Sequence, residues 1–177
     1  MTITPDGRDW TWVLEQACPE CGLDTRRVEP TDVAAMTRDV AAQWREVLAG
    51  PTAEVVARPS PEKWSTLEYG CHVRDVFGRF DERLHLMLNE IDPLFPNWDQ
   101  DATAIDDGYA AQNPVFVAQE LVEAGAAIAD SFDSVTGDEW HRTGARSDGA
   151  RFTIATFARY FVHDPIHHLY DVTGRRH

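Results

Sequence analysis

Helical periodicity is the feature that most constrains how this chain can fold. Apolar residues recur at steps of three and four in four long stretches, at residues 31–50, 60–91, 114–135 and 153–174. This spacing places the apolar side chains on one face of an α-helix. Gly50-Pro51 and Asp92-Pro93 end the first two stretches, and Pro114 suits the first turn of the third. Because no strand period or internal repeat accompanies them, the sequence predicts an all-α protein, a four-helix bundle.

Two interruptions affect how the helices connect. Residues 93–113 form a long connection between the second and third stretches, which is typical of a bundle crossover or of a cover over a site. Pro165 lies inside the fourth stretch, where it removes one backbone hydrogen bond. Either the helix continues with a kink, or Asp164 caps a new helix that begins at Pro165. We expect the kinked continuous helix, since the apolar pattern runs on both sides of Pro165.

Size and charge limit the classes of partner. A chain of 177 residues with 43% hydrophobic residues suits one domain with a packed core. The 30 acidic and 16 basic residues give a formal charge of −14, which disfavours nucleic acids and anionic membranes as partners. No apolar run approaches the roughly 20 residues of a membrane span. Residues 1–8 lack the basic and apolar regions of a signal peptide, so we expect a cytoplasmic protein. A bundle with this many exposed apolar helices could also form a homodimer.

Three of the seven histidines fall within six positions near the C-terminus. In a helix, His163 and His167 share one face, where their rings could bind one metal ion. His168 points about 100° away from His167 and is left out of the expected ligand set. A catalytic zinc-type centre usually takes three protein ligands, and His72 in the second stretch is the best candidate for the third. Alternatively, the histidines simply complement the negative end of the helix dipole.

Several charged residues lie near these histidines. Glu68, one turn before His72, could accept a proton or could orient the His72 ring. Asp164 is open to the same two interpretations. Arg79 and Arg83 follow His72 by about two and three turns, where they could bind a substrate carboxylate through paired hydrogen bonds. Surface salt bridges with neighbouring acids are the alternative for both arginines.

The N-terminal arm, residues 1–30, carries no helical pattern and precedes the predicted bundle at residues 31–177. Its Cys18-Pro19-Glu20-Cys21-Gly22 turn could hold a metal ion between two thiolates or cycle as a dithiol. A four-thiolate site would need a second pair, and only Cys71 remains. The alternative is that tryptophans pack the arm onto the bundle while both cysteines stay reduced.

Taken in order, three features of the sequence resemble the DinB-like proteins, a group of bacterial four-helix bundles that includes mycothiol-dependent maleylpyruvate isomerase. These features are Trp64-Ser65-x-x-Glu68-x-x-x-His72, the long link to the third stretch, and His163-x-x-x-His167. The resemblance spans about residues 31–175. It implies an up-down-down-up bundle in which His72, His163 and His167 bind a divalent metal, and it assigns no role to Cys18 and Cys21.

The resemblance also implies a chemistry. Neutral imidazoles suit zinc, nickel, iron or manganese, and three of them leave positions open for water or a thiol. The resemblance favours a metal-dependent enzyme that carries out thiol-dependent transfer or isomerisation of a small, anionic molecule with a low-molecular-weight thiol. One alternative is a non-catalytic metal- or ligand-binding bundle with a role in stress protection. A plain helical interaction domain without metal is the other.

Overall fold

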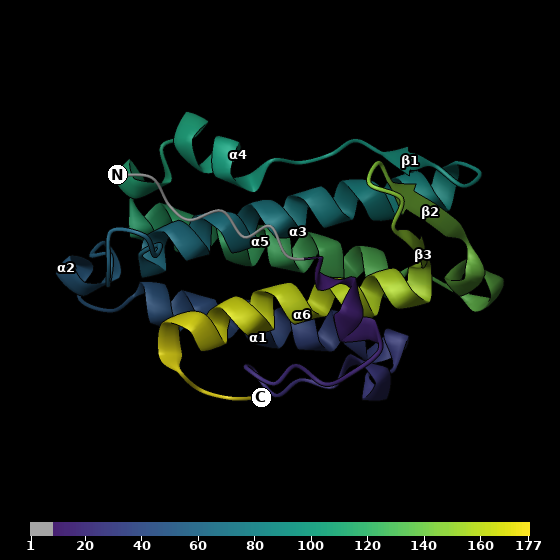
Figure 1. Cartoon of the computed structure of the whole chain (residues 1–177), viewed down its shortest axis with the longest axis horizontal. Helices are drawn as coiled ribbons and strands as arrows, with labels where there is room; N and C mark the ends of the chain where they lie inside the picture. The colour runs from purple at the N-terminus through teal and green to yellow at the C-terminus, as the bar shows by residue number, and fades with distance from the viewer. Residues whose placement is uncertain (1–8) are drawn as a thin grey trace.

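The computed structural model describes residues 9–177, and within this range four long helices pack as a bundle (Figure 1). They are α1 (Val33–Leu48), α3 (Thr66–Asn89), α5 (Pro114–Asp133) and α6 (Ile154–Thr173). Around the bundle, α1 packs against α5, α5 against α3, α3 against α6, and α6 against α1. Figure 1 shows α1 and α6 running in one direction and α3 and α5 in the other. The predicted up-down-down-up bundle is therefore confirmed.

Helix α3 begins at Thr66, later than the start of the predicted stretch 60–91, because Ser65 and Glu68 form a capping box. The Ser65 hydroxyl accepts a hydrogen bond from the Glu68 N–H at 3.2 Å, and the Glu68 carboxylate accepts the Ser65 N–H at 2.8 Å. These bonds satisfy backbone donors that a helix start leaves without partners. Ser60 forms an isolated β-bridge with Lys63 instead.

Helix α6 continues through Pro165, as the apolar pattern predicts. The indole N–H of Trp44, a fully buried residue of α1, donates to the Pro165 carbonyl oxygen at 3.0 Å. Gly174 ends the helix with a φ of 69°, a left-handed conformation that glycine adopts without strain. The histidine-rich segment therefore lies on one unbroken helix. No helix in the range 9–177 has the length and apolarity to cross a membrane.

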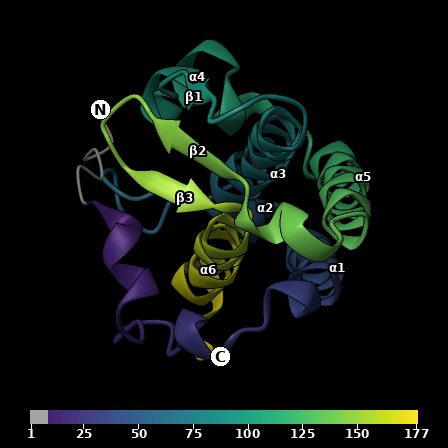
Figure 2. The same cartoon turned by 90° about the vertical axis from the view of Figure 1, so that its right-hand side faces the viewer.

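A small sheet lies at the end of the bundle where α6 begins (Figure 2). Strand β2 (Thr143–Arg146) pairs antiparallel with β3 (Arg151–Thr153) and parallel with β1 (Leu94–Phe95). The sequence shows no strand period, so this sheet is an addition to the predicted all-α bundle, and β1 belongs to the crossover. A Cβ added at Gly144 of β2 would lie 2.6 Å from the ring of Phe95 in β1, so only glycine fits at this position. The sheet thereby ties the crossover, which also carries α4 (Gln100–Asp106), to the start of α6.

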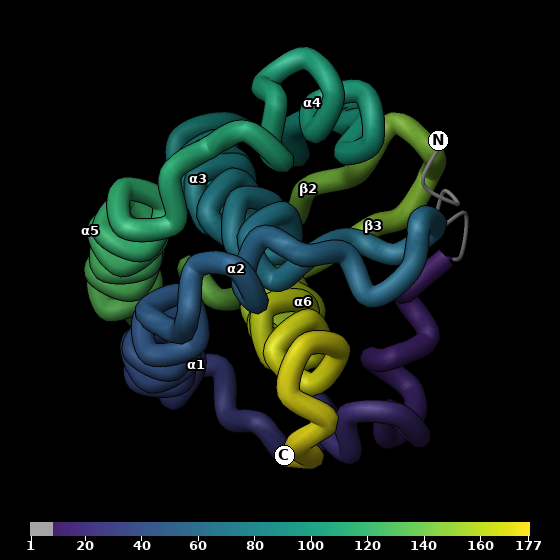
Figure 3. Tube along the Cα trace, turned by 90° about the vertical axis from the view of Figure 1, so that its left-hand side faces the viewer, coloured from purple at the N-terminus to yellow at the C-terminus, as the bar shows by residue number. Residues whose placement is uncertain are grey.

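The N-terminal arm lies along α6 (Figures 1 and 3). Residues 1–8 of the predicted arm lie outside the described residues. The rest forms short turns of 3-10 helix at Trp10–Leu14 and Thr25–Arg27, and Val13 is fully buried. The Arg159 guanidinium of α6 donates to the Val28 carbonyl at 2.8 Å, and the His177 N–H donates to the Cys21 carbonyl at 2.7 Å. The arm is thus held by α6 and by the C-terminal tail.

Short helices complete the described structure. They are α2 (Thr52–Val55) and the 3-10 turns Pro30–Asp32, Tyr109–Ala111 and Gly137–His141.

Candidate metal centres

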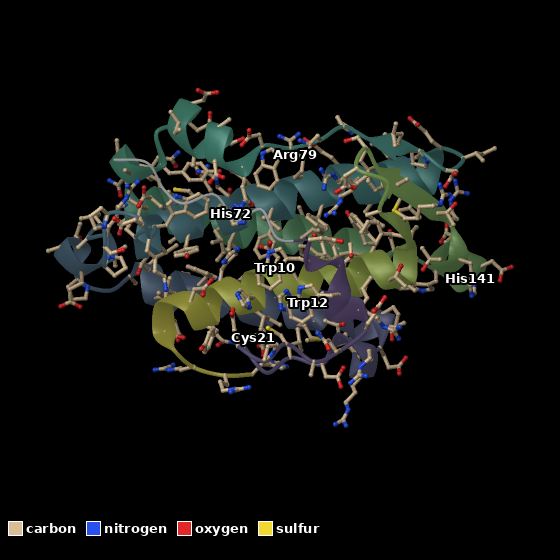
Figure 4. All side chains as sticks on the ribbon, in the orientation of Figure 1. Trp10, Trp12, Cys21, His72, Arg79 and His141 are labelled. Atoms are coloured by element: carbon tan, nitrogen blue, oxygen red, sulfur yellow. The ribbon has the colours of Figure 1, made fainter. Side chains whose placement is uncertain are left out.

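Helix α6 carries two overlapping pairs of potential metal ligands. His163 and His167 are four residues apart, and so are Asp164 and His168. Each pair shares one side of the helix, but consecutive residues are turned by about 100°, so the two pairs face different directions. Figure 4 shows His72 on α3, on one side of the α6 ribbon, and Cys21 on the other side. Each pair of α6 meets a different partner segment.

One pair meets α3. The candidate ligand atoms of His72, Asp164 and His168, here called the α3–α6 centre, all lie within 4.8 Å of one another. His72 Nε2 is 3.7 Å and His168 Nε2 is 3.8 Å from the same oxygen, Asp164 Oδ1. Both His72 ring nitrogens and Asp164 Oδ1 are buried without a hydrogen-bond partner among the described residues. Because such atoms are costly to bury, this donor set fits a divalent cation.

Neighbouring side chains fix the histidine rings of the α3–α6 centre. His168 Nδ1 lies 2.9 Å from Asp171 Oδ2. A hydrogen bond donated there by Nδ1–H places the Nε2 lone pair on the side of Asp164. The His72 ring stacks on Trp98 with centroids 5.5 Å apart and planes inclined by 3°. Trp98 belongs to the crossover, so the long link covers this centre.

Asp164 supplies the negative charge of the α3–α6 centre. Burial alone would raise the pKa of its carboxyl group, but His168 and His72 outweigh burial and lower this pKa to about 2. The carboxylate is therefore ionised near neutral pH. Two imidazoles and one carboxylate form the ligand set of several catalytic zinc enzymes and of many non-haem iron enzymes, and they leave coordination positions open.

The structure does not bring the three predicted ligands together. His72 belongs to the α3–α6 centre, whereas His163 and His167 join two cysteines of the arm. Sequence reasoning left out His168 because it points away from His167. The missed signal is a second pair with helical spacing, Asp164-x-x-x-His168. It was missed because only histidines were considered as ligands, whereas the first member of this pair is a carboxylate.

The second cluster, here called the arm centre, combines Cys18, Cys21, His163 and His167. Its candidate ligand atoms also lie within 4.8 Å of one another, and all four residues are buried. Cys18 Sγ is 3.6 Å from His167 Nδ1. Burial raises the pKa of the Cys21 thiol to about 12 and lowers that of the His163 imidazole to about 4. In the absence of metal, the Cys21 thiol and the His163 imidazole are therefore both neutral near pH 7.

A pocket of about 940 Å³ lies beside both clusters, and its wall includes Trp10, Trp98, Asp164, His168 and Arg83. The Arg83 side chain is 7% exposed, and one N–H donates to the Pro96 carbonyl at 3.2 Å. Its Nε has no hydrogen-bond partner, and no carboxylate pairs with it among the described residues. Burial, assisted by the charge of Arg146, lowers the pKa of Arg83 to about 10. Arg83 therefore remains positive near neutral pH and lies in the pocket wall without a salt-bridge partner among the described residues.

Arg79 and Glu68, also predicted site residues, lie outside the wall of this pocket. The Arg79 guanidinium pairs with Glu82 at 3.0 Å and lies over the Trp98 ring. The Glu68 carboxylate accepts hydrogen bonds from Ser65 and from the Arg58 guanidinium. Burial would raise the Glu68 pKa, but these partners outweigh it and lower the pKa. Glu68 is thus an ionised cap at the start of α3.

Comparisons with known proteins place this geometry in a family. No curated protein sequence matches the chain. The solved structure of YfiT from Bacillus subtilis, described as a probable metal-dependent hydrolase with an unusual four-helix bundle topology, has a TM-score of 0.77. The similarity covers 90% of this chain and 91% of YfiT at 16% sequence identity, and it shows a shared fold. The family model of the DinB superfamily matches residues 33–172, most of the bundle and all of the α3–α6 centre. This chain belongs to the DinB superfamily.

Proposed function

We propose that this protein is a metal-dependent enzyme whose catalytic centre is the α3–α6 centre. The observation that carries the proposal is the meeting of His72, Asp164 and His168 beside a large pocket, with three of their polar atoms buried and without partners. Two imidazoles and a carboxylate suit zinc, iron or manganese. A divalent ion held there would supply Lewis acidity, which lowers the pKa of a bound water or thiol.

Other residues of the chain hold the metal ligands in place and offer a group that can bind a substrate. Asp171 holds His168 in one orientation, and the rings of Trp98 and Trp64 both pack against His72. These contacts keep the ligands in place and limit the entry of water. Arg83 offers a guanidinium without a carboxylate partner at the pocket wall. Its paired N–H donors match a carboxylate, so the substrate is a small anionic molecule.

The reaction we propose is thiol-dependent transfer or isomerisation. A pocket of about 940 Å³ lies at the upper end of the usual range of roughly 300–1,000 Å³ for ligand sites. It can accommodate a low-molecular-weight thiol next to a small substrate. Hydrolysis by an activated water is the second candidate, and the similarity to YfiT supports it by analogy of fold.

The test compares turnover by two histidine variants of metal-loaded protein prepared without a polyhistidine tag. The substrates are small electrophiles with and without a carboxylate, each offered with and without a low-molecular-weight thiol. His168→Ala should abolish turnover, whereas His141→Ala should not, because His141 is exposed and lies far from the centre (Figure 4). Turnover that requires the thiol supports transfer or isomerisation, and turnover without it supports hydrolysis. Equal activity of both variants, or tight retention of a ligand without turnover, would contradict the proposed enzyme.

A further inference from the structure

The Cys18-x-x-Cys21 turn of the arm lies against the face of α6 that the proposed catalytic centre does not use. We propose that Cys18, Cys21, His163 and His167 form a closed structural zinc site. This zinc fixes the arm to the bundle and holds Trp10 in the wall of the pocket. The site is separate from the proposed catalytic centre, which uses the neighbouring face of the same helix.

The first support is the arrangement of the four ligand atoms. They lie within 4.8 Å of one another, and Cys18 Sγ is 3.6 Å from His167 Nδ1. In a tetrahedral site with bonds of about 2.0–2.3 Å, ligand atoms are about 3.3–3.8 Å apart. The side chains therefore need only small shifts to share one ion. Two cysteines and two histidines are a common ligand set of structural zinc, and thiolates select soft metals.

The second support is the hydrogen bonding of the histidines. His163 Nε2 is buried and has no hydrogen-bond partner among the described residues. His167 Nε2 lies 3.2 Å from a carboxylate oxygen of Glu20. When Nε2–H donates to this carboxylate, the Nδ1 lone pair is directed at Cys18, as metal-binding histidines are usually arranged. Glu20 lies between the two cysteines in sequence, so the same turn supplies two ligands and the group that orients a third.

The third support is the backbone of the turn itself. The Gly22 N–H donates to the Cys18 carbonyl at 3.0 Å, and the Cys18 N–H donates to the Leu23 carbonyl at 2.9 Å. Gly22 has a φ of 89°, which strongly favours glycine. An added Cβ there would also lie 3.3 Å from the His177 carbonyl oxygen. The chain therefore folds tightly around the two cysteines and places both thiols on the inside, with exposures of 1% and 0%.

Charge balance favours zinc over a redox-active cysteine pair. On binding, each thiol loses its proton to solvent and each sulfur donates an electron pair to Zn²⁺. Two thiolates, two neutral imidazoles and one dication have no net charge, which suits a site enclosed in the core. A Cys18–Cys21 disulfide would require an external oxidant and would leave the buried His163 Nε2 without a partner.

The arm centre also shapes the pocket. The Trp10 ring lies 5.5 Å from the His163 ring and 4.8 Å from the His167 ring, measured between centroids. Trp10 is also part of the wall of the pocket beside Asp164. Zinc that holds the two histidines would therefore hold Trp10 in place. With four protein ligands, the arm centre has no open position, so its role is structural.

The experiment is zinc K-edge X-ray absorption on the full chain purified without a tag, together with metal counting. We expect zinc bound by two sulfur atoms at about 2.3 Å and two nitrogen atoms at about 2.0 Å. The double variant Cys18→Ala/Cys21→Ala should lose this zinc. Cys71→Ala is the matched control and should keep it, since Cys71 is equally buried but lies on α3 outside both clusters.

Three results would overturn the structural zinc. They are zinc without sulfur ligands, a Cys18–Cys21 disulfide in freshly purified protein, and equal labelling of these thiols before and after chelation. All three are measured on wild-type protein, so they hold even if a variant fails to fold. His168→Ala should keep the sulfur-bound zinc. Failure of the proposed catalytic centre can therefore be distinguished from failure of the arm centre.

Discussion

Replacing Glu68 by glutamine should destabilise the fold while leaving the metal content unchanged. Glu68 is 2% exposed, and its carboxylate accepts hydrogen bonds from the Ser65 N–H at 2.8 Å, the Ser65 hydroxyl at 2.9 Å and Arg58 Nε at 2.8 Å. Hydrogen bonds to a charged group contribute about 1.5–3 kcal/mol each, and glutamine keeps the shape and one acceptor oxygen. We therefore expect a loss of about 2–3 kcal/mol, which lowers the melting temperature by about 4–12 °C in a chain of this size.

The pH dependence of this loss follows from the direction of the pKa shift. Folding lowers the pKa of Glu68, so its contribution to stability is fully present above the ordinary glutamate value of about 4.3. The contribution disappears as the pH falls through the lower pKa of the folded state. The difference in unfolding free energy between wild type and Glu68→Gln should therefore be constant near neutrality and shrink in acid.

Thermal and urea unfolding at several pH values measure this difference, and elemental analysis measures the metal content. Glu46→Gln is the matched control, because Glu46 is exposed on α1 and should change neither quantity. An unchanged melting temperature of Glu68→Gln, combined with loss of metal or activity, would refute a capping role. It would place Glu68 at the catalytic centre, as the sequence alone suggests.

Three further substitutions test the packing and the pocket. Gly125→Ala should lower the free energy of unfolding, measured with urea, by about 1–3 kcal/mol, because the added Cβ would lie 2.9 Å from the Ala41 Cβ where α5 meets α1. Unchanged stability would contradict this contact. Trp44→Phe removes the indole donor to the Pro165 carbonyl and should lower the free energy of unfolding by about 1–3 kcal/mol, measured by thermal melting. An equal melting temperature would show that this hydrogen bond is dispensable. Arg83→Met should weaken binding of carboxylate ligands by about ten- to a hundredfold in calorimetry without affecting neutral ligands, and equal affinity would exclude Arg83 from the site.

The fold was largely predictable because its main signals are local. The apolar spacing predicts the four helices. In the structure, α5 begins at Pro114 and α6 is capped by Gly174, as the sequence indicates. The start of α3 was harder, since both Ser60 and Ser65 can cap a helix and only the reciprocal bonds with Glu68 decide between them. Strand β1 has two residues and exists because β2 lies beside it. No local pattern predicts such pairing.

The ligand types were predictable, but their grouping was not. Helical spacing occurs twice in α6, in His163-x-x-x-His167 and one residue later in Asp164-x-x-x-His168. Periodicity shows that each pair shares a face, but it does not show which face meets α3. The neighbour of His163 and His167 is an arm about 140 residues earlier in the chain, and its position depends on tertiary packing. Only the structure separates the two centres.

The most direct measurement is an anomalous difference map from crystals of tag-free protein, recorded at the absorption edge of the bound metal. If α6 serves two centres, two separate peaks should appear, one in the α3–α6 centre and one in the arm centre. A single peak bonded to His72, His163 and His167 together would contradict the division of ligands between two faces of α6.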